Sequence, residues 1–272
     1  MASSAFKSDV STVAETVADL ARAGRIAQQT LARMPSSGRA TALLRAAQAL
    51  RDAAPAILAA NAADMEAAQL AGLSAAMLDR LLLDAPRLAG MADAVAMIAD
   101  LPDPVGQIID RRERPNGLVL ERVRIPVGLI GIVYESRPNV TADAAALCVR
   151  SGNAVLLRGG SEAVRSNRAI HAALVEGLVA GGVPAEAVQL IPTQDRAAVG
   201  AMLTAAGLID MIVPRGGKNL VARVQAEARV PVLAHLVEPQ APIIAAIRSS
   251  TTTFTKVFIG PLPSTLVISL SR

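Results

Sequence analysis

Two glycine pairs stand where an apolar stretch of the sequence gives way to a stretch typical of a helix. The residues at these turns are Arg158, Gly159, Gly160 and Ser161 in the first, and Pro214, Arg215, Gly216 and Gly217 in the second. Backbone N–H groups at a helix start attract phosphate, and glycine lets a ligand approach closely because it has no Cβ. The pattern favours a phosphate-bearing cofactor, although the same glycines would also permit tight turns. Neither pair matches the dinucleotide fingerprint G-x-G-x-x-G or a P-loop.

Asn139 follows another apolar stretch, residues 127–133, and precedes a predicted helix. An asparagine amide in this position can donate a hydrogen bond to an oxyanion that develops during acyl transfer. Asparagine is also a common residue at helix starts, where it caps the first turn. The residue type and its position leave both interpretations open.

Cys148 is the one cysteine of the chain, and it lies inside an alanine-rich helical stretch. No histidine is near it in sequence and no basic residue precedes it within one helical turn, so we interpret it as structural. A single cysteine excludes an internal disulfide and a cysteine-based zinc site. His171 and His235 are far apart, so we expect no metal site.

The elements that must position these residues alternate along the second half of the chain. Apolar stretches at 127–133, 154–157, 188–191 and 209–213 are each followed by a longer stretch of helical character. This alternation predicts an α/β fold, with a Rossmann-like parallel sheet and flanking helices. Because ligands bind at the carboxyl ends of parallel strands, both glycine pairs and Asn139 are expected at one edge.

The first half of the chain has a different pattern, which predicts mostly helical secondary structure. Residues 10–100 carry apolar positions at three- and four-residue spacing, which predicts successive helices, with one helix ending or restarting at 61–64. Residues 105–109 and 118–124 flank a Pro-Asn-Gly turn, which predicts a β-hairpin. The sequence predicts a helical scaffold over 1–104, a hairpin arm over 105–124, a dinucleotide-binding domain over 125–236, and an atypical tail over 237–272.

The composition limits the classes of protein that the chain can represent. Basic residues exceed acidic ones, 27 against 23, but they are spread along the chain and aromatic residues make up 1%. We therefore expect no nucleic-acid binding. No apolar run reaches the length of a membrane span and the first residues do not form a signal peptide, so we expect no membrane association and a cytoplasmic location.

Three blocks of the middle region resemble one known family. They are IPVGLIGIVYESRPNVT at 125–141, SGNAVLLRGG at 151–160 and IDMIVPRGG at 209–217. Together with the residues around them they resemble γ-glutamyl phosphate reductase, also called glutamate-5-semialdehyde dehydrogenase, a member of the aldehyde dehydrogenase superfamily. The resemblance extends from about residue 10 to residue 236.

The resemblance implies an oxidoreductase of proline biosynthesis, in which NADPH reduces L-glutamyl 5-phosphate to L-glutamate 5-semialdehyde. It implies that Asn139 steadies the oxyanion, that Arg158 to Ser161 hold the adenosine end of NADPH, and that Pro214 to Gly217 lie against the pyrophosphate. It also implies that the hairpin arm serves oligomerisation, so a homo-oligomer is expected.

The resemblance ends before the family's catalytic domain, which carries the nucleophilic cysteine. Residues 237–272 match nothing in the family and contain no cysteine, and a thioester mechanism without a thiolate loses its covalent step. We therefore expect a truncated chain with little or no reductase activity. The alternatives are a reductase whose end was altered by a frameshift or splice, a non-catalytic dinucleotide-binding or partner-binding protein that associates with a full-length reductase, and a product that does not fold stably.

Overall fold

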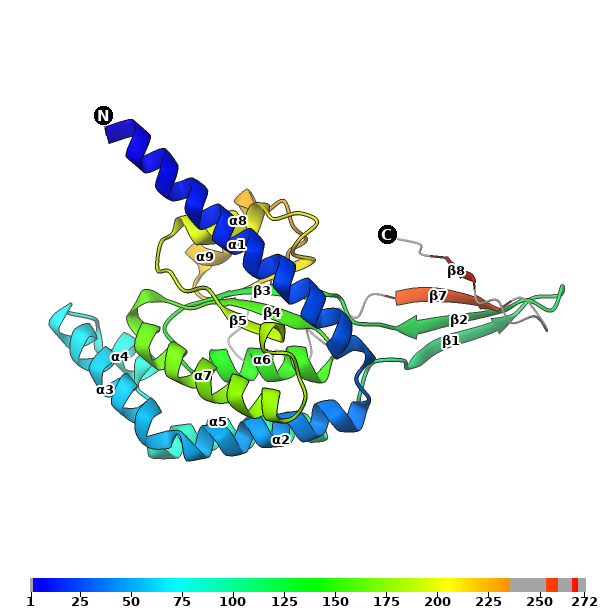
Figure 1. Cartoon of the computed structure of the whole chain (residues 1–272), viewed down its shortest axis with the longest axis horizontal. Coiled ribbons are helices and arrows are strands. Elements are labelled where there is room, and N and C mark those ends of the chain that lie inside the picture. Colours follow the sequence, from blue (N-terminus) through cyan, green and yellow to red (C-terminus); the bar gives the residue numbers. More distant parts are fainter. Residues whose placement is uncertain (1, 235–252, 259–265, 269–272) are drawn as a thin grey trace.

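The computed structural model describes residues 2–234, 253–258 and 266–268, with side chains over 12–234. A body of helices and parallel strands carries an arm of antiparallel strands at one end (Figure 1). The fold class is α/β, as the alternating sequence pattern predicts. Most of the predicted atypical tail at 237–272, and His235, lie outside the described residues.

Five helices precede the first strand. They are α1 (Ala2–Arg33), α2 (Ser36–Asp52), α3 (Ala54–Leu70), α4 (Ala75–Leu81) and α5 (Ala85–Asp100). The breaks between them fall at Pro35, near Pro55, at Gly72 and before Pro86, where proline fixes the first helical turn or glycine takes a positive φ.

The predicted helix end at 61–64 is wrong, because α3 continues through it. Asn61 and Asp64 are both buried. The Asn61 amide accepts a hydrogen bond from the Leu83 N–H at 2.8 Å, and Asp64 accepts one from the Ser166 N–H at 2.8 Å. These polar residues therefore face partners on other elements instead of ending their own helix.

The parallel sheet has the order β5-β4-β3-β6. Its strands are β3 (Leu129–Tyr134), β4 (Ala154–Arg158), β5 (Val188–Leu190) and β6 (Met211–Arg215). The helices that follow β3, β4, β5 and β6 are α6 (Val140–Arg150), α7 (Val164–Ala180), α8 (Ala197–Thr204) and α9 (Lys218–Glu227), with short 3₁₀ turns at Ser161–Ala163 and Ala185–Ala187.

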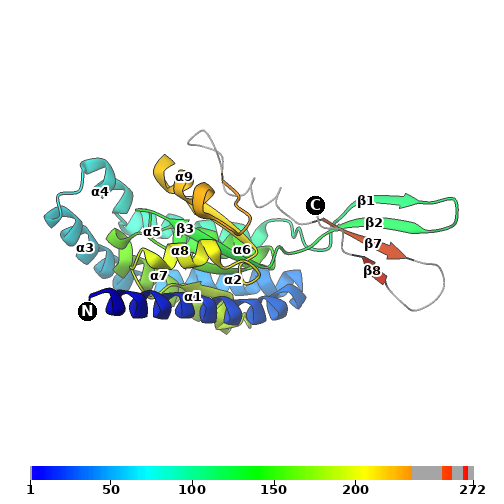
Figure 2. The same cartoon turned by 90° about the horizontal axis from the view of Figure 1, so that it is seen from above.

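Helices lie on both faces of this sheet (Figures 1 and 2), and an apolar cluster fills each side. Alternate side chains of a strand point to opposite faces. Ile130 and Ile132 pack with α2, α5, α6 and α7, whereas Leu129 and Val133 pack with α1 and α8. Every residue of β3 is buried, so the central strand is held from both faces.

Helices α2 and α7 pack closely because α7 carries glycine at the contact. A Cβ on Gly177 would lie 2.4 Å from the Cα of Ala46, and one on Gly181 would lie 2.3 Å from the Cα of Ala42. The neighbouring atoms belong to the backbone and cannot rotate away. Glycine therefore sets the distance between these two helices.

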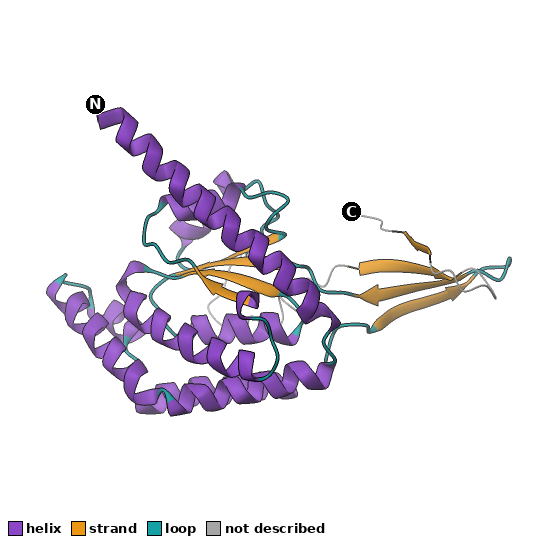
Figure 3. Ribbon diagram, in the orientation of Figure 1, coloured by secondary structure: helices purple, strands orange, loops and turns teal. Residues whose placement is uncertain are grey.

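The arm forms a second sheet (Figure 3). Strands β1 (Ile108–Glu113) and β2 (Val119–Arg124) form the predicted hairpin, and β7 (Thr253–Phe258) and β8 (Leu266–Ile268) extend it in the order β1-β2-β7-β8, all antiparallel. Strand β1 is an edge, where Ile108 and Ile109 are 54% and 47% exposed. The sequence pattern alone did not predict β7 or β8.

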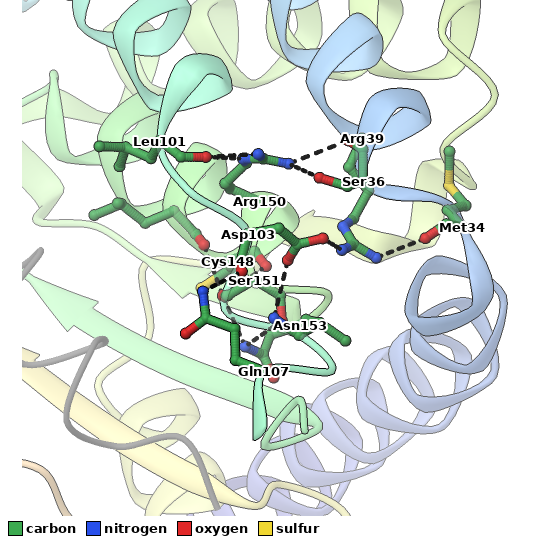
Figure 4. Close-up of polar contacts among 12 residues, drawn as sticks. Met34, Ser36, Arg39, Leu101, Asp103, Gln107, Cys148, Arg150, Ser151 and Asn153 are labelled. Carbon is green, nitrogen blue, oxygen red and sulfur yellow. Dashed lines mark hydrogen bonds and ion pairs between the residues drawn. The ribbon is translucent and has the colours of Figure 1, made fainter. Parts of the chain in front are cut away.

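A buried polar network joins α2, α6 and the base of the arm (Figure 4). The Arg39 guanidinium donates to the Asp103 carboxylate at 2.5 Å, and the Arg150 guanidinium donates to the Leu101 carbonyl and to Ser36. Asp103 in turn accepts from the Val105 N–H at 3.0 Å. This network fixes the point at which the arm leaves the body.

Candidate functional site

The ends of three neighbouring strands bring the predicted site residues to one edge of the sheet. Val133 pairs with Arg158 of β4, and Tyr134 pairs with Arg215 of β6. The first glycine pair therefore follows β4 on one side of β3, and the second follows β6 on the other side. Asn139 lies after β3, between them.

The four glycines at these turns do not have the positive φ that would explain glycine by turn geometry. At three of them a Cβ would come close to the end of a neighbouring side chain. A Cβ on Gly159 would lie 2.2 Å from the Asn167 amide nitrogen, one on Gly160 would meet the Glu162 carboxylate at 2.6 Å, and one on Gly216 would meet the Glu135 carboxyl carbon at 2.5 Å. These neighbours are the ends of side chains, which can move, so close approach of a ligand and tight-turn geometry both stay open as interpretations of the glycines.

The turn after β6 holds an anionic group at the start of α9. The Gly217 N–H donates to the Glu135 carboxylate at 2.8 Å, and Glu135 is exposed. A helix start favours negative charge because its N–H groups lack partners within the helix. The backbone here is therefore accessible to an oxyanion, and a side chain of the protein now takes that place.

The arginines at the two turns, Arg158 and Arg215, are partly buried, unlike ordinary surface arginines. The Arg158 guanidinium donates to the Gly159 carbonyl at 2.7 Å and to the Gln194 carbonyl at 2.9 Å, and its buried Nε has no partner among the described residues. Burial lowers the pKa of Arg158 from its ordinary value. Burial also lowers the pKa of Arg215, and the positive charge of Arg137 lowers it further. Ser161 is exposed and begins the 3₁₀ turn before α7.

Asn139 stands at the N-cap position of α6, but its side chain does not cap the helix. Its amide nitrogen donates instead to the Asp143 carboxylate at 2.8 Å. Burial raises the pKa of Asp143 to about 6, although the Asn139 amide and Arg215 oppose this shift. The other oxygen of Asp143 is buried without a partner among the described residues. One N–H of the Asn139 amide is thus fixed, which leaves its second N–H for another acceptor.

A buried hydrogen-bond chain supports this loop from below. The Tyr134 hydroxyl lies 2.7 Å from the Thr141 hydroxyl, which lies 3.1 Å from the Asn167 side-chain oxygen. Burial raises the pKa of Tyr134 above its ordinary value, so it stays neutral. The chain links β3, α6 and α7 directly beneath Gly159.

The thiol and the described histidine do not form a nucleophilic site. Cys148 is fully buried, and burial raises the pKa of its thiol to about 12. His171 lies 3.0 Å from the Val188 carbonyl, and burial lowers its pKa. Within residues 2–234, 253–258 and 266–268, no group of three or more His, Cys, Asp or Glu is arranged to hold a metal ion. No helix in the described part of the chain is long and apolar enough to cross a membrane.

Comparison with known proteins first defines the class. The sequence profile of the aldehyde dehydrogenase family matches residues 8–241. The chain therefore belongs to the aldehyde dehydrogenase family.

Individual relatives narrow this class. γ-Glutamyl phosphate reductase of Novosphingobium aromaticivorans is 72% identical over 229 residues, which are 83% of this chain and 54% of that protein. The crystal structure of γ-glutamyl phosphate reductase from Thermotoga maritima has a TM-score of 0.78 at 39% identity, covering 80% of this chain and 52% of the other. That from Saccharomyces cerevisiae has a TM-score of 0.74 at 35% identity, covering 80% and 55%.

Within the class, the chain is thus a member of the γ-glutamyl phosphate reductase family, as the sequence resemblance predicts. It spans about half the length of the curated relatives it matches. Enzymes of the aldehyde dehydrogenase family use a nicotinamide dinucleotide.

Glu135 and Asp143 are site residues that reasoning from sequence alone missed. The spacing of Asn139 and Asp143 was an available signal, since residues four apart at a helix start lie on the same face. No such signal existed for Glu135, because its partner Gly217 is 82 residues away in the chain.

Proposed function

We propose that the chain is the cofactor-binding part of a γ-glutamyl phosphate reductase. In this proposal, the edge formed by β4, β3 and β6 holds NADPH for the reduction of L-glutamyl 5-phosphate to L-glutamate 5-semialdehyde, with release of phosphate. The observation that carries it is the placement of both glycine turns at the carboxyl ends of strands that flank β3. As members of this family are biosynthetic enzymes, a cytoplasmic location belongs to the same proposal.

The residues at this edge fit a dinucleotide. A Cβ on Gly216 would lie against the Glu135 carboxylate, and the Gly217 N–H already accommodates that oxyanion. The pyrophosphate is assigned to this turn, and the adenosine end to Arg158 and Ser161 at the turn after β4. When bound, the cofactor would supply hydride to the acyl carbon.

Asn139 is assigned the oxyanion of the reacting acyl group. Asp143 holds one amide N–H of Asn139, so the other keeps a fixed direction. The sequence offers no accessible thiol, because its one cysteine is buried in α6. The covalent step of the proposed reaction therefore requires a thiolate that this chain does not contain.

Cofactor binding is tested by titrating the purified 272-residue chain with NADPH and following nucleotide fluorescence. Gly216→Val places a side chain against Glu135, so the dissociation constant for NADPH should rise by about tenfold or more. Glu135→Gln removes a negative charge from the proposed pyrophosphate site and should tighten binding. Gly200→Ala is the matched control, because a Cβ at Gly200 meets nothing within 4 Å.

Unchanged NADPH affinity in Gly216→Val would refute the placement of the pyrophosphate. Absence of NADPH binding by the unaltered chain would refute the proposed function. A parallel titration with NADH tests the preference for the phosphorylated cofactor.

Turnover is a separate question with its own test. We expect this chain alone to show little or no NADPH oxidation with L-glutamyl 5-phosphate, because it lacks the thiolate. Steady oxidation that depends on glutamyl phosphate and disappears in Asn139→Ala would overturn this expectation.

The arm favours a second candidate function, association with another copy or with a full-length reductase. Edge strand β1 exposes Ile108 and Ile109, and an unpaired strand edge with apolar side chains is suited to pairing with another chain. Gel filtration with light scattering should give a defined oligomer that Ile109→Lys dissociates. A monomer, or failure to co-purify with a full-length partner, would remove this candidate.

A further inference from the structure

A cavity of about 410 Å³ is lined in part by Asn139, and none of the residues of the two glycine turns lines it. It is lined by the end of α4 and the residues after it, by α5, by the loop that joins β3 to α6, and by the first turn of α6. Its polar lining consists of Asp79, Arg80, Arg87, Arg137, Asn139 and Asp143. The cavity therefore joins α4, α5, α6 and the β3–α6 loop around the amide that the proposed reaction assigns to the oxyanion.

One arginine of the lining is already neutralised. Arg87 donates to the Asp79 carboxylate at 2.6 Å and to the carbonyls of Asp79 and Leu82. Arg87 lowers the pKa of Asp79, mainly through the hydrogen bond and further through its positive charge. This pair leaves little net charge in the cavity.

Arg80 and Arg137 are different, since neither side chain has a hydrogen bond or ion pair with any residue that the structure describes. Arg137 lies near enough to Asp79 to lower its pKa and near enough to Arg215 to lower that one also. Its positive charge therefore acts on Asp79 of α4 and on Arg215 at the end of β6, and it lines the cavity with Asp79 and Asn139. An anion bound here would relieve the repulsion between Arg137 and Arg215.

The remaining carboxylate does not balance these charges. Asp143 is turned toward the Asn139 amide, and burial favours its neutral form. With Asp79 paired to Arg87, the cavity presents two guanidinium groups that lack a partner among the described residues against one carboxylate, Asp143. Guanidinium is the group best suited to bind phosphate or carboxylate through two parallel hydrogen bonds.

We infer that this cavity binds the oxyanion group of the substrate, with Arg137 as the main ligand and Arg80 as the second. Arg137 is two residues before Asn139, so an anion that it holds lies beside the amide. The inference rests on the proposed reductase function, and it deepens that proposal by naming the residues that select an anionic substrate. Two groups of a glutamyl phosphate share this chemistry, the phosphate and the α-carboxylate.

The test is calorimetric titration of the whole chain with inorganic phosphate and, separately, with L-glutamate, at constant ionic strength. Arg137→Ala should weaken binding by about tenfold or more, because a charge-assisted, two-pronged contact is lost. Arg137→Lys should recover part of the loss, since it restores charge without the planar fork. Arg114→Ala, in the exposed hairpin turn, removes the same charge far from the cavity and should leave binding within about twofold.

Tighter binding of phosphate than of L-glutamate assigns the cavity to the phosphate, and the reverse assigns it to the α-carboxylate. If neither binds, or if Arg114→Ala weakens binding as much as Arg137→Ala, the inference is wrong. Titration of Arg80→Ala with NADPH separates the proposed cofactor function from the proposed anion site. NADPH binding without anion binding refutes only this inference, whereas anion binding without NADPH binding refutes only the proposed function.

Discussion

Replacing Asp143 with asparagine should stabilise the folded chain at neutral pH. Burial raises the pKa of Asp143 from 3.8 to about 6, so the ionised carboxylate is unfavourable in the folded state. A pKa change of this size corresponds to about 3 kcal/mol at pH 7.5. In Asp143→Asn the side-chain oxygen can still accept the bond from the Asn139 amide, and the position of the unpartnered oxygen stays unsatisfied in both proteins.

The effect has a defined pH window. Because the folded-state pKa is the higher one, the protonated carboxyl contributes stability that is complete below pH 3.8. That contribution is lost as the pH rises through about 6. The advantage of Asp143→Asn should therefore be about 3 kcal/mol at pH 7.5 and about 1 kcal/mol at pH 4.5. The charged groups that face Asp143 include Arg215, which opposes the shift and does not titrate in this range.

The assay is urea unfolding of both proteins at these two pH values, with the free energy of unfolding obtained by linear extrapolation. Asp93→Asn serves as the control, since Asp93 forms an exposed ion pair with Arg51 and should change stability by less than about 1 kcal/mol. An advantage of Asp143→Asn that is equal at both pH values, or a loss of stability at pH 7.5, would refute the reasoning.

Two further predictions concern the interior. Gly177→Ala should destabilise the chain by about 1–3 kcal/mol, because its Cβ would lie 2.4 Å from the Cα of Ala46. Gly200→Ala, in open space on α8, should instead stabilise it by about 0.5–1 kcal/mol, and thermal melts compare the two. Cys148 should not react with a thiol reagent at pH 8 until the chain unfolds, because it is fully buried and its pKa is about 12. Rapid labelling of the native chain would contradict that expectation.

The cost of a buried carboxylate next to Asn139 has a functional explanation within the proposed function. A neutral side chain would hold the amide at a smaller loss of folding stability. An ionised carboxylate can only accept hydrogen bonds, so it determines which group of the Asn139 amide faces it. The amide nitrogen must then face Asp143. Stability is commonly lower at positions that orient a reacting group.

The sequence by itself determined the alternation of strands and helices, the hairpin and the family. These features depend on local patterns, namely apolar runs, turn residues and motif blocks, which can be read without knowing where the chain folds back. The sequence also indicated that the glycine pairs and Asn139 share an edge, because parallel strands end on the same side of a sheet. Cys148 was predicted to be structural from its alanine-rich surroundings, and its complete burial agrees.

Only the tertiary structure decided what each polar group contacts. Asn61 and Asp64 resemble a helix end in sequence, yet they are buried against residues up to 105 positions away. Glu135 reaches Gly217 across the sheet, and the charged cavity beside Asn139 requires α4, α5 and the β3–α6 loop together. Such contacts depend on the packing of distant segments, because a polar side chain can be satisfied by any partner that folding brings within hydrogen-bond distance.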